Sequence, residues 1–125
     1  VRGPRTVTLL GLSFKAHTND IRNSVALDII PALQARGVTV RVYDPVAMPT
    51  MQAVFHDVIY CTSAYEAAED TDCIVILTEW PEFSTLDLAV LGSVCRKKRI
   101  IDTRNLFSPT NLYNHGFDFI TMGTL

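Results

Sequence analysis

Short apolar segments recur along the chain at intervals that suit the strands of a β-sheet. Residues 38–44 alternate between apolar and polar positions, with Val38, Val40 and Val42 on one face, which is typical of a half-buried strand. Residues 73–78 are apolar on both faces, as in a central parallel strand that is covered on both sides. The pattern predicts strands at 6–12, 38–44, 58–60, 73–78, 99–102 and 117–122.

The segments between these strands carry apolar residues at the spacing of a helix. From Ala26 onward, residues 24–36 are apolar at positions i, i+3, i+4 and i+7, and Ser24 is the predicted N-cap. Pro31 conflicts with this pattern, because inside a helix it leaves a carbonyl unpaired at a cost of about 3 kcal/mol. The sequence therefore predicts either a kink at Pro31 or a helix that begins later, at Asp28. Further helices are predicted at 50–55, at 63–69 behind a capping box of Ser63 and Glu66, at 86–94 and at 109–116.

Strands and helices thus alternate through the whole chain, which predicts an α/β fold. Such alternation is typical of a single doubly wound, Rossmann-like domain, here spanning residues 1–125. We expect a parallel sheet of about six strands with helices on both faces, because each pair of parallel strands needs a crossover connection. Ligands of such sheets bind beyond the carboxyl ends of the strands, so the loops that follow the strands are the candidate binding site.

The bulk composition limits the classes of function. With 125 residues, 48% of them hydrophobic, the chain is long enough for one domain with an ordinary core. The formal net charge is −2, and the basic run 96–99 is typical of a solvated helix end. Neither a nucleic acid nor a membrane is therefore an expected partner. No apolar stretch of the sequence is long enough to span a bilayer.

The cysteines and histidines form no recognisable catalytic or metal site. The three cysteines are not spaced like zinc ligands, and their odd, low number fits a reducing cytoplasm. The three histidines lie in different segments, so neither a catalytic triad nor a metal site is predicted. The residues concerned are Cys61, Cys73, Cys95, His17, His56 and His115.

Basic side chains follow two of the predicted strands. Lys15 and Arg22 come after the first strand, and Arg104 comes after the fifth. Because the carboxyl ends of parallel strands meet at one edge of the sheet, these cations converge there, which suits a phosphate or pyrophosphate. The alternative is that they only pair with loop carboxylates such as Asp20 or Asp102, and the spacing is compatible with both interpretations.

The turn after the first strand lacks the features of a dinucleotide-binding site. Such a turn reads GxGxxG, so that a pyrophosphate can lie on the helix N-terminus, whereas here Gly11 stands alone and Phe14 and Lys15 fill the turn. Asp44 ends the second strand, where an acid that binds ribose or accepts a phosphoryl group would lie. A receiver-like domain would also need an acidic pair after its first strand, and none follows Gly11. The chain is therefore not expected to bind NAD by itself.

Four segments together resemble the signatures of a known family and occur in the family's order. Residues 11–24 read GLSFKAHTNDIRNS, close to the signature GLxFKxxTxDxRxS, and residues 43–45 read YDP. Residues 78–83 read TEWPEF, similar to TEWxEF, and residues 102–105 read DTRN. Over nearly its whole length, the chain resembles the C-terminal domain of the UDP-glucose/GDP-mannose dehydrogenase family. The TEWxEF segment favours the UDP-glucose branch.

The resemblance implies an enzyme of three parts, of which this chain is the third. The family's N-terminal Rossmann domain binds NAD, a central helical region makes the dimer, and the catalytic cysteine precedes the C-terminal domain. Such an enzyme oxidises the C6 alcohol of a UDP-sugar twice with NAD, through an aldehyde and a cysteine thiohemiacetal, to the uronic acid used in polysaccharide biosynthesis. The implied partners are a UDP-sugar and the rest of the dehydrogenase, in a parent that is a homodimer or larger. The chain, which begins with Val1, is expected to be a fragment with no catalytic residue and no activity alone.

Residue by residue, the resemblance assigns binding roles to the same edge of the sheet. Phe14 and Lys15 match the pair that contacts the substrate, with the ammonium on the pyrophosphate and Phe14 beside the nucleotide. Arg104 matches an arginine that contacts the substrate from the end of the fifth strand. Arg22 matches one that reaches the NAD held mainly by the N-terminal domain. Trp80 is expected near the pocket in a packing role.

Other functions remain compatible with the sequence. One alternative is a stand-alone, non-catalytic module that binds a nucleotide or a partner. A second is another nucleotide-sugar dehydrogenase, for UDP-N-acetyl-mannosamine or GDP-mannose, since the sugar is read mainly outside this domain. A third is a receiver-like domain that is phosphorylated on Asp44.

Overall fold

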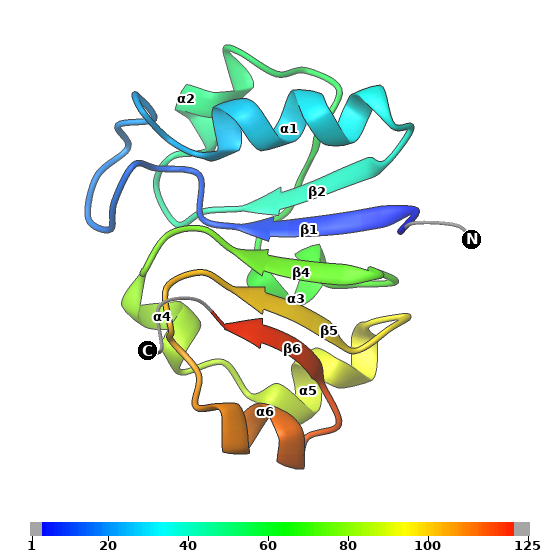
Figure 1. Cartoon of the computed structure of the whole chain (residues 1–125). Helices are drawn as coiled ribbons and strands as arrows, with labels where there is room; N and C mark the ends of the chain where they lie inside the picture. The colour runs from blue at the N-terminus through cyan, green and yellow to red at the C-terminus, as the bar shows by residue number, and fades with distance from the viewer. Residues whose placement is uncertain (1–3, 122–125) are drawn as a thin grey trace.

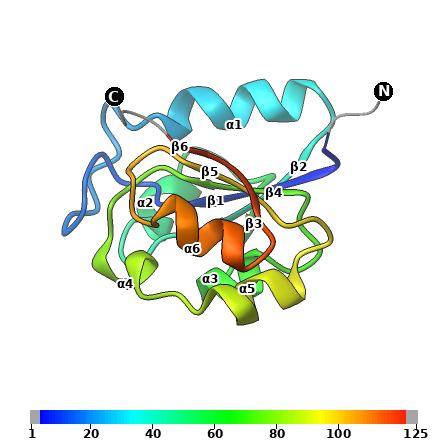
Figure 2. The same ribbon diagram turned by 60° about the horizontal axis from the view of Figure 1, so that its bottom comes forward.

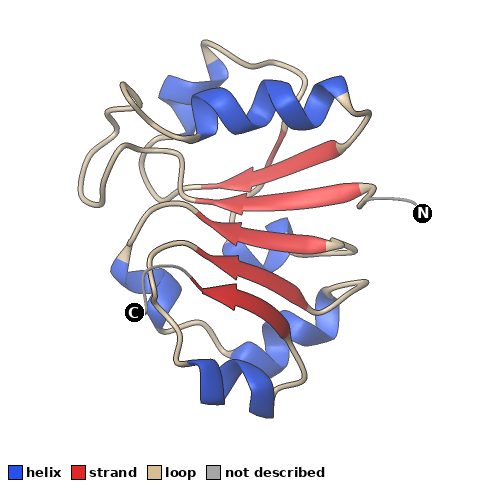
Figure 3. Cartoon of the chain, in the orientation of Figure 1, coloured by secondary structure: helices blue, strands red, loops and turns tan. Residues whose placement is uncertain are grey.

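A six-stranded, fully parallel sheet forms the centre of the computed structural model, which describes residues 4–121 (Figures 1 and 3). The strand order is β3-β2-β1-β4-β5-β6, so the direction of winding reverses between β1 and β4. This confirms the predicted doubly wound α/β fold. The strands are β1 (Thr6–Leu10), β2 (Thr39–Tyr43), β3 (Ile59–Tyr60), β4 (Cys73–Ile76), β5 (Arg99–Asp102) and β6 (Asp118–Thr121).

Helices cover both faces of the sheet, as Figure 2 shows for α1 on one side and α3, α5 and α6 on the other. Buried residues of α1 and α2 pack in one hydrophobic cluster, and those of α3, α4, α5 and α6 pack in a second. None of the helices between residues 4 and 121 has the length and apolar character needed to cross a membrane. The helices are α1 (Ala26–Ala35), α2 (Met48–Gln52), α3 (Ala64–Ala67), α4 (Pro81–Ser84), α5 (Leu88–Val94) and α6 (Pro109–Asn114).

The first helix differs from its prediction at the N-terminus. It begins at Ala26 and continues through Pro31, so the alternative start at Asp28 is wrong. Val25 is the N-cap residue, and Ser24 instead accepts a hydrogen bond from the Ala26 N–H at 3.2 Å. Pro31 is tolerated because its ring lies on the exposed face, while the buried side of the helix packs on the sheet.

Helix boundaries elsewhere differ from the predictions by a few residues. The helix α2 begins and ends earlier than predicted, and α4 was not predicted because its four residues are too few for a periodic pattern. The predicted last strand is found at Asp118–Thr121, and its expected end at Met122 lies outside the described residues.

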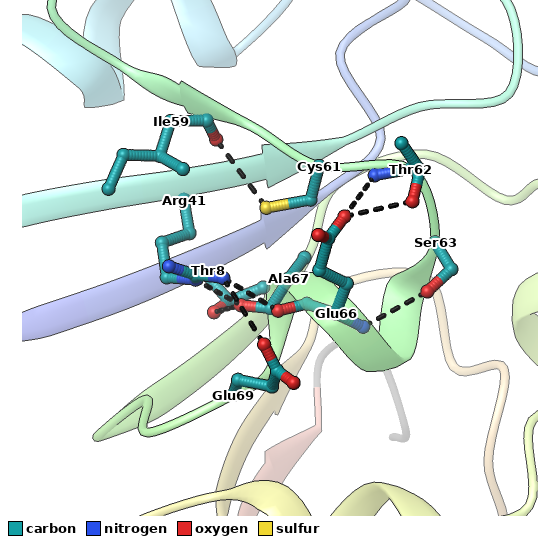
Figure 4. Close-up of polar contacts among 9 residues, drawn as sticks. All are labelled: Thr8, Arg41, Ile59, Cys61, Thr62, Ser63, Glu66, Ala67 and Glu69. Atoms are coloured by element: carbon teal, nitrogen blue, oxygen red, sulfur yellow. Dashed lines mark hydrogen bonds and ion pairs between the residues drawn. The ribbon is translucent and has the colours of Figure 1, made fainter.

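Ser63 is the N-cap of the short helix α3, as the sequence predicts, but Glu66 reaches back to Thr62 and not to the Ser63 N–H that a capping box requires (Figure 4). Ser63 Oγ accepts from the Glu66 N–H at 3.0 Å, and Glu66 Oε1 accepts from the N–H and the hydroxyl of Thr62 at 2.5 and 2.9 Å. At the other end, Arg41 of β2 donates to the carbonyls of Glu66 and Ala67. A helix of four residues is unstable alone, so these contacts fix it under the sheet.

Candidate functional site

The loops that follow β1 and β5 are both attached to the end of β4, which lies between those strands. Thr78 Oγ1 donates to the Ser13 carbonyl in the first loop at 2.9 Å. On the other side, Arg104 Nε donates to the Leu77 carbonyl at 2.9 Å. The segment 77–80 is therefore a bridge between the loop that carries Lys15 and the loop that carries Arg104.

Gly11 permits the close approach between the first loop and β4. Its φ of +100° lies in a region that residues with a side chain rarely adopt. A Cβ atom at this position would lie 2.5 Å from Thr78 Oγ1 and 2.7 Å from the Thr78 backbone nitrogen. Only glycine fits here, and the reason is contact with β4 rather than contact with a dinucleotide.

Arg104 is fixed at one edge of its guanidinium group and free at the other. Its Nε donates to Leu77 and lies 3.4 Å from Glu79 Oε1, a buried oxygen that accepts no hydrogen bond from the described residues. Its backbone N–H donates to Asp102 Oδ1 at 3.1 Å. Within residues 4–121 the two terminal nitrogens of Arg104 have no hydrogen-bond partner. This half-exposed fork can take two oxygens of a phosphate at once.

Phe14 and Lys15 form the tip of the first loop. Phe14 is 47% exposed, an unusual fraction for so large an apolar side chain. Lys15 is exposed, and its ammonium makes no hydrogen bond or ion pair with the described part of the chain. The backbone around them is ordered by two hydrogen bonds, from Ser13 Oγ to the Lys15 carbonyl at 2.8 Å and from the Phe14 N–H to the Asp20 carbonyl at 2.7 Å.

Arg22 is paired within its own loop. Its Nε and Nη2 donate to the two carboxylate oxygens of Asp20 at 3.0 and 2.8 Å, while its side chain remains 87% exposed. The hydrogen bonds from the Arg22 side chain, with that from its backbone N–H, lower the pKa of Asp20 to about 2. Arg22 thus pairs with a loop carboxylate, as the alternative interpretation of the basic residues predicts. Within residues 4–121, Lys15 and the terminal nitrogens of Arg104 do not.

Asp44 is an internal anchor and not a ligand-binding acid. It is fully buried, and its carboxylate accepts from four backbone N–H groups, in the first loop and in the turn that follows β2, and from one side chain. All of these partners are donors, so no lone pair is left for a ribose hydroxyl and no oxygen is accessible to a phosphoryl group. The donors are the backbone N–H groups of Leu12, Ser13, Val46 and Ala47 and the Trp80 indole.

Sequence reasoning finds the packing role of Trp80 but not its hydrogen bond. Trp80 is 6% exposed and belongs to the core, as predicted. Its Nε1 also donates to Asp44 Oδ2 at 3.0 Å, which the sequence does not reveal because the two residues are far apart along the chain. The sequence predicts only that a buried Trp80 indole N–H has some acceptor, without indicating which residue it is.

The cysteines are not activated thiols. Cys61 is buried, with Sγ 3.8 Å from the Ile59 carbonyl (Figure 4), and burial raises its pKa. Burial also raises the pKa of Cys73, and it raises that of Cys95 to about 11. Among residues 4–121 no three His, Cys, Asp or Glu side chains are grouped closely enough to hold a metal ion.

The sequence of this chain is similar to those of known proteins. Residues 8–109 match the profile of the UDP-glucose/GDP-mannose dehydrogenase family, UDP binding domain. The chain belongs to this family. Its UDP-binding domain is 43% identical over 120 residues to UDP-glucose 6-dehydrogenase TuaD of Bacillus subtilis, covering 95% of this chain and 26% of that enzyme. It is 36% identical over 123 residues to the UDP-glucose 6-dehydrogenase of Rhizobium meliloti, covering 98% of this chain and 28% of that enzyme.

Solved structures of the same family share the fold of this UDP-binding domain. A UDP-glucose dehydrogenase from Pyrobaculum islandicum matches 95% of this chain and 25% of its own, with a TM-score of 0.74 and 30% identity. The UDP-D-ManNAc dehydrogenase from Pyrococcus horikoshii matches 93% of this chain and 25% of its own, with a TM-score of 0.73 and 31% identity. These findings confirm the family resemblance and the fold class. The chain spans about a quarter of the length of these relatives.

Proposed function

We propose that this domain, residues 1–125, is the C-terminal part of an NAD-dependent UDP-glucose 6-dehydrogenase and holds the UDP part of its substrate. The observation that carries the proposal is a pair of unpaired cationic groups at one sheet edge, the Lys15 ammonium and the outer edge of Arg104. Two relatives that align with 95% and 98% of this chain are UDP-glucose 6-dehydrogenases, which supports the choice of reaction. The parent enzyme would convert UDP-glucose to UDP-glucuronate in two successive oxidations at C6.

Each binding residue has a role that follows from its chemistry. Lys15 places a compact point charge against the diphosphate, and the planar guanidinium of Arg104 donates hydrogen bonds to two of its oxygens. Phe14 offers an exposed ring against which the nucleotide can pack. These groups bind equally well before and during reaction, so they contribute by holding C6 in position for groups supplied elsewhere in the enzyme.

The catalytic groups are proposed to lie outside this chain. Burial raises the pKa of all three cysteines, which supports a nucleophilic cysteine elsewhere in the parent enzyme. The NAD-binding domain is also proposed to lie in the rest of the enzyme. Arg22, exposed on the first loop, is proposed to reach that NAD across the interface between domains. The chain alone is expected to produce no NADH from UDP-glucose and NAD, and the parent is expected to be a cytoplasmic homodimer or larger.

An uncovered part of the sheet supports a larger parent protein. On the α1 side, Val75, Ile101 and Ile120 lie next to one another across β4, β5 and β6, and Ile120 is 59% exposed. Ile101 and Ile120 belong to neither hydrophobic cluster of the described residues, and a hollow of about 190 Å³ lies beside them. Parallel sheets are normally covered on both faces, so we propose that the rest of the dehydrogenase completes this layer.

A UDP titration followed by NMR tests the proposal. UDP and UDP-glucose should shift the amide signals of Phe14, Lys15 and Arg104, while NAD should leave them unchanged. Lys15→Ala and Arg104→Ala should each weaken UDP binding at least about tenfold, because each removes a charge-assisted contact. Lys97→Ala, which removes an equally exposed lysine at the opposite edge of the sheet, is the matched control and should bind like the wild type. Equal affinities in all variants would remove both residues from the site.

The sugar itself is a separate question, because a UDP-D-ManNAc dehydrogenase is as similar in structure as a UDP-glucose dehydrogenase. We propose that this domain reads UDP and leaves the choice of sugar to the rest of the enzyme. UDP, UDP-glucose and UDP-N-acetyl-mannosamine should then bind with similar affinity, and GDP-mannose should bind more weakly. A strong preference between the two UDP-sugars would place sugar recognition in this chain.

A further inference from the structure

Trp80 lies where the loops of the proposed UDP site meet, and its indole makes a hydrogen bond in addition to its packing contacts. It follows β4 directly and is buried to all but 6% of its surface. Its Nε1 donates to Asp44 Oδ2 at 3.0 Å. The acceptor is therefore a fully buried carboxylate at the end of β2, two strands away from Trp80 in the sheet.

The same carboxylate oxygen holds the base of the Lys15 loop. Asp44 Oδ2 accepts from the N–H groups of Leu12 and Ser13 at 2.7 and 3.2 Å. All five hydrogen bonds of the Asp44 carboxylate come from N–H donors, four of the backbone and one of the Trp80 indole. Hydrogen bonds to an ionised acceptor are about twice as strong as neutral ones, which makes this a firm junction between Trp80 and the loop.

Trp80 also contacts the first loop on the C-terminal side of Lys15, through His17. His17 packs its ring edge-on against the indole, with ring centroids 5.4 Å apart and planes at 70°. A left-handed backbone conformation, with φ of 66°, turns His17 toward this contact. Ser13 lies two residues before Lys15 and is connected to Trp80 through Asp44. His17 lies two residues after Lys15 and contacts Trp80 directly, so Trp80 restrains the loop on both sides of Lys15.

The residues just before Trp80 make the corresponding contacts to Arg104. Leu77 accepts from Arg104 Nε, and Glu79 places a carboxylate oxygen 3.4 Å from the same atom. One short segment thus determines where both cations of the proposed site stand.

We propose that Trp80 is a positioning residue for UDP binding: through Asp44 and His17 it holds the Lys15 loop at the separation from Arg104 that a diphosphate requires. This inference rests on the proposed function for its ligand, but the contacts themselves exist without one. Trp80 acts through Lys15 and touches no part of the nucleotide.

The positioning role can be measured in the absence of UDP. Trp80 is the sole tryptophan, so the protein has a single indole N–H signal in its NMR spectrum. Trp80→Phe keeps an aromatic ring in the core and removes the donor. We expect faster backbone motion at residues 14–17 and faster hydrogen exchange at Leu12 and Ser13, with α5 unchanged. A loop as rigid as in the wild type would overturn the proposal.

A double-mutant cycle connects the loop to binding. Trp80→Phe should weaken UDP binding about three- to tenfold in the wild-type background, but less than about twofold in the Lys15→Ala background, because the two residues act through one contact. In the Arg104→Ala background the loss should persist. A loss of equal size in all three backgrounds would mean a general structural effect and would contradict the proposal.

A second variant guards against failure of Trp80→Phe to fold. His17→Asn removes only the ring contact, since asparagine also tolerates a left-handed backbone, and it should loosen the loop and weaken UDP binding about twofold. No change in either quantity would count against the proposal. If Trp80→Phe loosens the loop but the wild-type chain shows no UDP-dependent shifts, the proposed function fails while the positioning of the loop stands.

Discussion

Single residues decide how closely the loops of this domain approach one another. Gly11 lets the first loop pass against Thr78, and Asp44 gathers donors from the turn after β2, the first loop and Trp80. Both positions resemble features of dinucleotide-binding sites, a glycine after β1 and an acid after β2. In this fold both serve internal contacts: Gly11 lies against Thr78, and Asp44 accepts hydrogen bonds from the first loop and from Trp80.

The two glycines with positive φ at the ends of β1 and α1 give a matched test at this scale. Gly11→Ala should lower the free energy of unfolding by at least about 3 kcal/mol, because it adds a clash with Thr78 to backbone strain. Gly37→Ala should cost only about 1–2 kcal/mol, because its φ is +76° but nothing lies within 4 Å of the added atom. Urea denaturation of both variants measures the difference, and equal losses would show that the Thr78 contact relaxes freely.

At the scale of elements, the amino ends of the central strands are joined by an ion pair between a buried carboxylate, Asp72, and the half-exposed Arg96. Asp72, just before β4, accepts from the N–H groups of Arg5 and Thr6 at the start of β1 and from the side chain of Arg96 before β5. The basic run 96–99 is therefore not simply a solvated helix end, because Arg96 neutralises this carboxylate. Lys15 and Arg104, the residues proposed to bind UDP, lie at the opposite edge.

The hydrogen bonds that Asp72 accepts from Arg5, Thr6 and Arg96, called the Asp72 clamp below, should make the free energy of unfolding depend on pH. Burial raises the pKa of Asp72, but hydrogen bonds from Arg96 and from the two backbone N–H groups outweigh it and lower the pKa to about 2. The unfolded chain binds the proton more readily, so this stabilisation is present above about pH 4 and is lost as the pH falls toward 2.

Asp72→Asn should cost about 2 kcal/mol near pH 7, and the difference from the wild type should shrink steadily as the pH approaches about 2. Urea denaturation at several pH values measures this difference. Asp87→Asn, at the exposed cap of α5, is a control for the loss of a carboxylate outside the clamp. A penalty for Asp72→Asn that does not vary with pH would argue against the pKa shift.

Pro31 gives a second prediction at the scale of elements. Pro31→Ala should raise the free energy of unfolding by about 1–3 kcal/mol, because it restores a donor inside α1 on an exposed face. Pro109→Ala, in the first turn of α6, should bring no such gain, since proline is well suited to that position. Thermal unfolding of the two variants tests the contrast, and a loss on Pro31→Ala would mean that the ring makes a contact worth more than the hydrogen bond.

At the scale of the whole molecule, the sheet separates two hydrophobic clusters that share its central strands. Leu9 of β1 packs in the cluster on the α1 side, whereas Ile74 of β4 and Trp80 pack in the cluster on the other side. Because β1 and β4 contribute to both, neither layer keeps its core once the other is lost. The domain should therefore unfold in one cooperative transition.

The single tryptophan allows this cooperativity to be tested across the sheet. Leu9→Ala should lower stability by about 2–5 kcal/mol, and the Trp80 fluorescence transition should shift as far as the circular dichroism transition although Leu9 is on the opposite face. Ile74→Ala, on the Trp80 side, should move both signals in the same way. A fluorescence transition that ignores Leu9→Ala would show that the two layers unfold separately.

The sequence by itself determined the parallel doubly wound sheet, the order of its elements apart from α4, and the edge at which the cations lie. These follow from local patterns: hydrophobic periodicity, a helix N-cap, and loop residues placed after strands. The family resemblance, carried by four short segments, extended this to the choice of Phe14, Lys15, Arg104 and Arg22 as candidate binding residues, and those assignments stay predictions.

Only the tertiary structure decided which polar groups are occupied and which are free. Asp20 pairs with Arg22, and the Trp80 indole pairs with Asp44, while Lys15 and the outer edge of Arg104 have no partner within residues 4–121. Spacing along the chain could not separate these cases, because a hydrogen bond depends on distances of tenths of an ångström between segments brought together by β-strand pairing. The helix through Pro31 was also decided there, since burial of one face outweighs a local penalty that the sequence alone shows.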